Sequence, residues 1–129
     1  MRLGALALLP SLLVLTACRS ALDQAVAAYA QARYPSAAAE FRELEPTARH
    51  FGAREFASYA LYRGLTHLAL GDARAASLWL GYAEVSADRD PEIFSDADRG
   101  ALIAAWRSMG HMPGEPGFLQ AADERARSP

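Results

Sequence analysis

The chain has 129 residues, with 13 basic side chains against 15 acidic ones and a formal net charge of −2, so nothing favours a polyanionic partner such as nucleic acid. Alanine is abundant and β-branched residues are few, which favours an all-α fold. After the first 17 residues, the remaining length suits one domain.

Residues 1–17 have the features of an export signal. Arg2 supplies a positive charge, and the apolar run from Leu3 to Leu15 is too short to span a hydrocarbon layer of about 30 Å. Cys18 follows and is the only cysteine, so it cannot form a disulfide within the chain. An ordinary secretory signal or a buried first helix would be the alternative interpretations.

The string Leu15-Thr16-Ala17-Cys18 resembles the lipobox of bacterial lipoproteins. The resemblance implies a signal peptide over 1–17, cleavage before Cys18 and fatty acyl chains such as palmitate on that cysteine. It implies no other cofactor. It also implies the bacterial cell envelope, and because Arg19 rather than Asp follows the cysteine, the outer membrane facing the periplasm.

Apolar spacing predicts about five helices over 18–110. The first spans 21–33, with Leu22, Val26 and Tyr29 on one stripe. Ser36 is expected to cap a second helix that ends near Leu44, where Pro46 stops it and a linker follows over 47–52.

A third helix is predicted from about Ala53 to Leu70, and its apolar residues cover more than one face, which is typical of a helix between two neighbours. Gly71-Asp72 predicts a tight turn into a fourth helix over 73–86. Ser95 with Asp98 resembles a capping box that opens a fifth helix ending at Gly110.

The region 111–129 differs in composition from the helical part. Two prolines and two glycines follow His111 and prevent the helix from continuing. Phe118 to Arg127 can form a short amphipathic helix, which would act either as a strap over the last helix or as an arm that binds a partner.

Helix pairs recur along the chain. The sets Ala37-Phe41-Leu44 and Ala76-Leu80-Ala83 have the same internal spacing and are offset by 39 residues, as are Gly71 and Gly110. The common offset predicts a duplicated helix-turn-helix unit.

The window 57–91 resembles a tetratricopeptide repeat, through Gly64, the Gly71-Asp72 turn, Ala76, Leu80, Ala83 and Pro91. The 39-residue offset exceeds that family's 34 residues, and Arg63 stands where a leucine is usual. The resemblance implies a short antiparallel solenoid of helix hairpins over 18–110; another helical hairpin bundle is the alternative.

In tetratricopeptide arrays the first helix of each pair lines a concave groove. The resemblance therefore implies a partner groove on the third predicted helix, through Ser58, Leu61, Leu65, Leu68 and Ala69. The leucines could accept an amphipathic helix or an extended peptide. Alternatively, the first helix or the C-terminal region already buries them.

Signals for catalysis or metal binding are weak. The three histidines lack metal-ligand spacing, and His67 falls where the repeat family places an aromatic packing residue. The acidic run from Asp88 to Asp98 lacks the glycine of a calcium loop and suits a helix N-terminus. We therefore expect no catalytic residue, no metal site and no small-molecule substrate.

These features predict a lipid-anchored helical-repeat lipoprotein that acts as a protein-binding adaptor or assembly factor in the envelope. Its expected partners are the membrane, through the lipid on Cys18, and another envelope protein. An accessory of an envelope enzyme, for example one acting on peptidoglycan, and a purely structural lipoprotein are the alternatives.

Overall fold

The computed structural model describes residues 20–111, and this part of the chain contains helices and no strand. The all-α prediction is confirmed. The elements are α1 (Ala21–Ala30), α2 (Tyr34–Glu43), α3 (Glu45–Ala48), α4 (Ala53–Ala69), α5 (Ala73–Arg89) and α6 (Asp96–Ser108). The five longer helices correspond to the five predicted ones, and α3 is an additional single turn.

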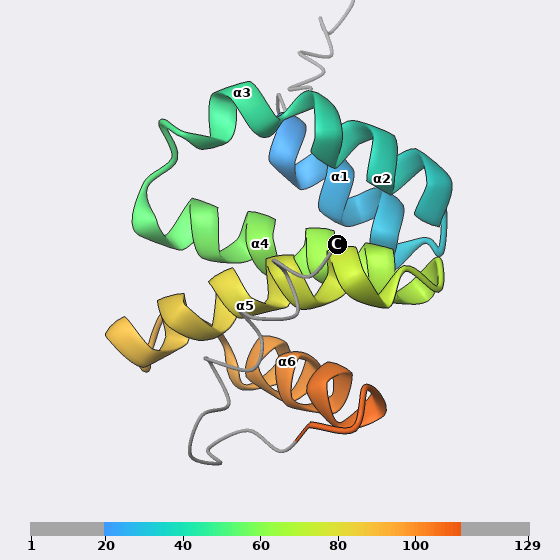
Figure 1. Ribbon diagram of the computed structural model, residues 1–129. Coiled ribbons are helices and arrows are strands. Elements are labelled where there is room, and N and C mark those ends of the chain that lie inside the picture. The colour runs from blue at the N-terminus through green and yellow to red at the C-terminus, as the bar shows by residue number, and fades with distance from the viewer. Residues whose placement is uncertain (1–19, 112–129) are drawn as a thin grey trace, which may run out of the picture.

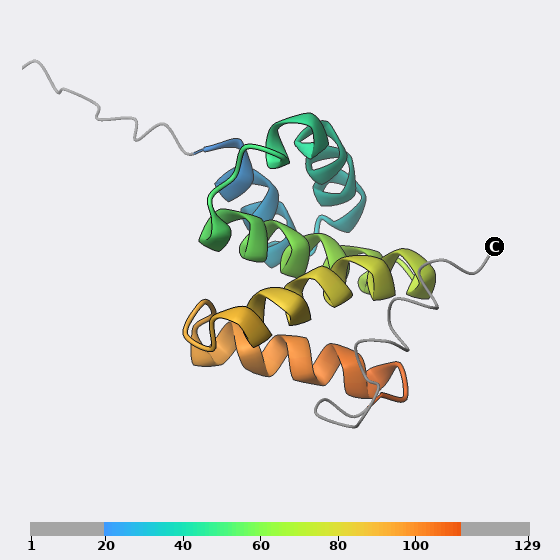
Figure 2. The same ribbon diagram turned by 60° about the vertical axis from the view of Figure 1, so that its left-hand side comes forward.

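The helices are stacked in layers (Figure 1). The antiparallel α1–α2 hairpin, with α3 beside it, forms one end, and the α4–α5 hairpin lies in the middle. Helix α6 packs against both α4 and α5 at the opposite end, and Figure 2 shows the same order. Because α4 also contacts α1 and α2, it is the central helix of the fold.

Both predicted second helices bury their matching stripes. Ala37 and Phe41 of α2 and Ala76 and Leu80 of α5 are all fully buried. Each hairpin has its own core, and the two cores adjoin along α4, where Tyr59 belongs to the first core and Leu61 to the second. The residues at equivalent positions of the two helices are therefore buried alike.

Local capping fixes the helix ends that the sequence predicted. Gly71 has a positive φ of 79°, and the Asp72 side chain accepts a hydrogen bond from the Ala75 amide, so the tight turn between α4 and α5 is confirmed. Ser95 caps α6 by accepting a bond from the Asp98 amide.

Two prolines lie in the first turns of helices, although Pro46 was predicted to end one. Pro35 lies in the first turn of α2, which starts before Ser36, so the predicted Ser36 cap is wrong. Pro46 lies in the first turn of α3, which shortens the predicted 47–52 linker. A proline is tolerated there because amides of the first turn have no partner within the helix.

The α4–α5 hairpin depends on close backbone approach. A Cβ atom added to Gly64 would lie 2.7 Å from Leu80 Cγ and 3.0 Å from the Leu80 backbone nitrogen. Ala76, one turn before Leu80, is fully buried. A side chain at position 64 would therefore displace Leu80, so glycine is required where these two helices approach each other.

Gly64→Val is expected to lower the free energy of unfolding by on the order of 1–3 kcal/mol, because the new side chain overlaps Leu80. Chemical denaturation followed by circular dichroism measures this loss. Gly100→Val is the matched control, since Gly100 is also helical but has no other atom within 4 Å of its added Cβ. Equal losses in the two variants would contradict a close crossing at Gly64.

Candidate partner-binding cleft

The predicted groove on α4 is largely closed. Leu61 is 0% exposed and Leu65 is 7% exposed, and both belong to the core cluster that contains Trp106 of α6. Leu68 packs partly against the same cluster. The prediction of an open groove through these leucines is therefore wrong, because α5 and α6 pack against that side of α4.

The remaining predicted groove residues have a different environment. Ser58 is half-buried and Ala69 is exposed. Helical spacing places both on one side of α4 with Tyr62, which is half-buried and donates a 2.7 Å hydrogen bond to Asp98 Oδ1. An aromatic and a carboxylate therefore occupy this side in place of the expected row of leucines.

The structure has a different apolar surface, which we call the aromatic cleft. It is built on Phe56 and Tyr59 of α4 and on Trp79 and Tyr82 of α5. Each ring contacts two of the others, with ring centroids between 5.4 and 6.1 Å apart. These tilted and edge-on contacts are favourable geometries for aromatic pairs, so the rings hold one another in place.

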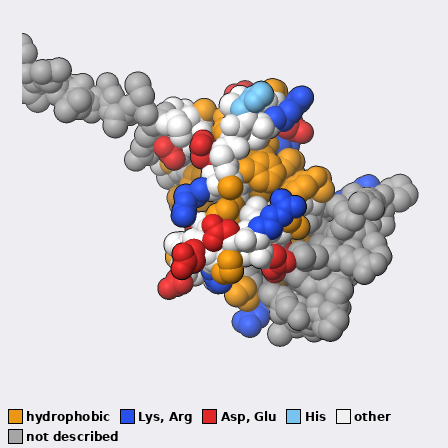
Figure 3. All heavy atoms as spheres, turned by 90° about the vertical axis from the view of Figure 1, so that its left-hand side faces the viewer, with side chains coloured by type: hydrophobic (Ala, Val, Ile, Leu, Met, Phe, Trp, Pro, Cys, Tyr) orange, Lys and Arg blue, Asp and Glu red, His pale blue; other side chains and the backbone are white. Residues whose placement is uncertain are grey.

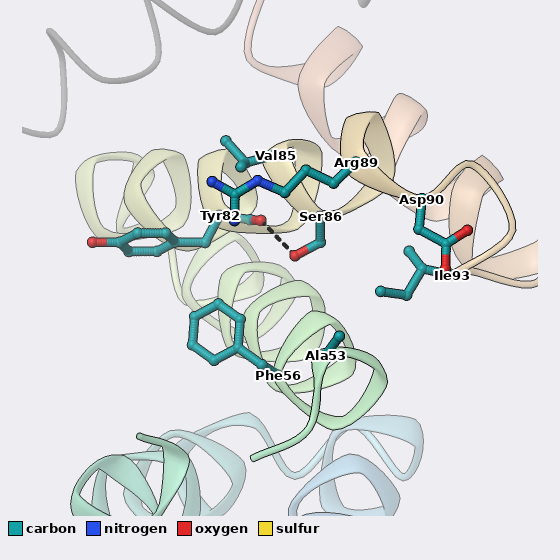
Figure 4. A pocket seen from close by; sticks show the side chains of 8 residues that line it. All are labelled: Ala53, Phe56, Tyr82, Val85, Ser86, Arg89, Asp90 and Ile93. Carbon is teal, nitrogen blue, oxygen red and sulfur yellow. Dashed lines mark hydrogen bonds between the residues drawn. The ribbon is translucent and has the colours of Figure 1, made fainter. Parts of the chain in front are cut away.

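Two adjoining hollows open along the aromatic cleft. The larger, of about 460 Å³, lies between the start of α4 and the end of α5 (Figure 4). It is lined by Ala53, Phe56, Tyr82, Val85, Ser86, Arg89, Asp90 and Ile93. The smaller, of about 300 Å³, is lined by Glu45, Ala48, Arg49, Phe56, Tyr59, Trp79 and Tyr82.

Phe56 and Tyr82 line both hollows, so the two hollows form one continuous surface. Figure 3 shows the side of the molecule where α4 begins, with hydrophobic side chains gathered between arginines and acidic residues. Tyr82 is 45% exposed, unlike the fully buried Tyr59. The cleft thus combines a rigid base with an accessible aromatic edge.

A buried guanidinium supports the base of the cleft. Arg63 is 7% exposed, and its Cζ lies 4.1 Å from the centroid of the Trp79 ring. Its guanidinium also donates to the Tyr59 hydroxyl and pairs with Glu45 Oε2 at 3.2 Å. A desolvated cation over a tryptophan contributes about 2 kcal/mol, so Arg63 stabilises the orientation of Trp79.

The titration of nearby groups follows from their burial. Burial raises the pKa of Tyr59, and the charge of Arg63 opposes that rise. Burial lowers the pKa of His67, and Arg63 lowers it further. Burial also raises the pKa of Glu84, with a smaller contribution from Asp88. Near neutral pH the tyrosine hydroxyl and the imidazole are therefore uncharged.

The lowered pKa of His67 predicts a loss of stability in acid. Below the usual imidazole pKa of 6.5, the unfolded chain takes up a proton that folded His67 resists. The free energy of unfolding therefore decreases as the pH is lowered. His67→Phe is expected to reduce this fall between about pH 7.5 and pH 5. Urea unfolding of both proteins measures the difference, and parallel curves would contradict it.

The part of the chain that the structure describes contains no group of three histidine, cysteine or acidic side chains that could hold a metal ion. Asp96 and Asp98 lie in the first turn of α6, where the helix dipole favours negative charge. The predictions for the signal peptide over 1–17, for Cys18 and for 112–129 lie outside the described residues.

Sequence reasoning missed the aromatic cleft, although a signal for it was present. Phe56 and Tyr59 are three positions apart in the sequence, as are Trp79 and Tyr82, so each pair lies on one side of its helix. Two such pairs on adjacent antiparallel helices can form one aromatic surface. Arg63, one helical turn after Tyr59, lies on the same side of α4.

The comparisons with known proteins add no relative. No protein family, curated protein or solved structure matches the chain. Among residues 20–111, no helix is both long enough and apolar enough to cross a bilayer.

Proposed function

We propose that the protein is a lipid-anchored adaptor or assembly factor of the bacterial cell envelope, attached through Cys18 to the outer membrane and facing the periplasm. The lipobox-like string supports the anchor. The close α4–α5 crossing at Gly64 and the Gly71-Asp72 turn support tetratricopeptide-like packing. In this proposal the chain binds another protein and catalyses no reaction.

The aromatic cleft is the observation that carries the binding role. Tyrosine and tryptophan are enriched among the residues that dominate protein interfaces, because they bury a large area and retain a polar group. Tyr82 is one of two large hydrophobic side chains that are strongly exposed in the described part of the chain. Tyr82 lines both hollows and therefore lies at the centre of the proposed interface.

The lining indicates the kind of partner. The base is aromatic and aliphatic, whereas Glu45, Arg49, Arg89 and Asp90 bring charges of both signs to the two hollows. A partner segment with apolar side chains and flanking polar groups matches this arrangement. An amphipathic helix or an extended peptide from another envelope protein has such a pattern.

The test is capture of a partner from detergent-solubilised membranes. Tyr82→Glu should abolish capture, because it places a charge at the centre of the apolar surface. Leu70→Glu is the matched control, since Leu70 is also 45% exposed but lies at the C-cap of α4, outside both hollows. The control should capture the same protein as the unmodified chain.

Two outcomes would contradict the proposed interface. Equal capture by the Tyr82 variant would show that the cleft is not the binding surface. Equal loss in both variants would show that any added surface charge prevents capture. Circular dichroism of each variant checks that the helices are retained, since neither position is buried.

A further inference from the structure

The start of the fold lies very close to the proposed lipid. Ser20 caps α1 by accepting a hydrogen bond from the Asp23 amide, and it is two residues beyond Cys18. Two residues span at most about 7 Å of chain. If Cys18 is lipid-modified, as the proposed function requires, the first turn of α1 cannot move far from the membrane surface.

The first turn of α1 lies at the α3 end of the molecule. Leu22 of that turn shares a core cluster with Leu44, the N-cap of α3, and with Ala48, the last residue of α3. Figures 1 and 2 both show α1 beginning at this end, and α6 on the far side of the α4–α5 hairpin. The axes of packed helices lie about 8–10 Å apart. One such distance separates the α1–α2 layer from the α4–α5 hairpin and another separates that hairpin from α6, so α6 lies roughly 16–20 Å beyond the α1–α2 layer.

The short tether, not charge, sets the orientation. Arg49 and His50 are exposed at the α3 end, but so are Asp23 and Glu43, so this end is not strongly basic. Phe51 is partly exposed there, and aromatic side chains suit the interface between headgroups and acyl chains. This surface is compatible with lipid contact, and the short tether holds it next to the headgroups.

We propose that α3 and residues 49–52 rest on the lipid headgroups, with α6 directed away from the bilayer. Ala48 and Arg49 belong both to this contact and to the smaller hollow of the aromatic cleft. The cleft therefore opens beside the bilayer. Its occupant is a protein segment that lies close to the membrane surface.

The lipid thioether blocks Cys18, so a second cysteine can be labelled selectively in the mature protein. Thr47→Cys and Ala104→Cys introduce label sites on α3 and α6, both at exposed positions. Each fluorescently labelled protein is reconstituted into phosphatidylethanolamine and phosphatidylglycerol vesicles that contain a nitroxide-headgroup lipid. Most of the fluorescence at position 47 should be lost, and that at 104 should be unchanged.

A flexible Gly/Ser insertion of about 20 residues between Arg19 and Ser20 should remove the difference while the protein stays attached, because the tether no longer restrains the domain. Equal quenching at both positions without the insertion, or stronger quenching at 104, would overturn the proposal. Intact mass tests lipidation separately. Absence of the lipid would contradict the anchor of the proposed function, whereas equal quenching of a lipidated protein would contradict the orientation alone.

Discussion

Replacing Leu61 with alanine is expected to lower the free energy of unfolding by about 2–5 kcal/mol. Leu61 is fully buried in the cluster that contains Leu80, Leu102 and Trp106, so the substitution leaves a cavity where three helices meet. Domains of this size are stable by only about 5–15 kcal/mol, so the loss is a large share of the total.

Leu70→Ala provides the control for that result. Leu70 is 45% exposed, and surface substitutions usually change stability by less than about 0.5 kcal/mol. Urea denaturation of the two variants, followed by circular dichroism, gives both values. A Leu61 variant as stable as the Leu70 variant would mean that this side of α4 is open, as the sequence suggested.

Local chemistry explains what the sequence predicted well. The Gly71-Asp72 turn and the Ser95 cap each depend on a few neighbouring residues, so they can be recognised without knowing the fold. Gly64 was marked by the tetratricopeptide resemblance, and the close approach of Leu80 explains why a residue without a side chain is needed there. These features determine where the chain turns between helices and where two helices approach closely.

The environment of each helix face could not be predicted in the same way. The spacing of Leu61, Leu65 and Leu68 shows that one side of α4 is apolar, but not whether solvent or another helix covers it. That depends on α6, which begins only at Asp96 and joins the same core through Trp106. The two prolines presented the same ambiguity, since proline can follow one helix or begin the next.

The aromatic cleft required tertiary information for a similar reason. Its rings come from α4 and α5, and the partner of Arg63 comes from α3, 18 residues earlier. The sequence marked Arg63 only as an unusual residue at a leucine position. In the folded protein its guanidinium lies against the Trp79 ring and pairs with Glu45, two contacts that depend on the packing of α3, α4 and α5.

The largest expected effect on localisation comes from Cys18→Ala, which should move the protein from the membrane fraction to the soluble fraction. Burial of an acyl chain contributes about 0.8 kcal/mol per methylene, so two or three chains make attachment effectively permanent and their loss removes it. No helix in the described part of the chain could replace that anchor by crossing the bilayer. Fractionation after a high-salt wash measures the distribution.

Arg19→Asp is the matched control, because it changes the next residue and leaves the thiol in place. The lipobox resemblance implies that this variant stays attached and that an Asp directly after the cysteine retains it in the inner membrane. A Cys18→Ala protein that resists the high-salt wash would contradict the lipoprotein assignment, since another surface would then hold the protein. The short tether would no longer orient the domain, and the contact between α3 and the headgroups would lose its basis.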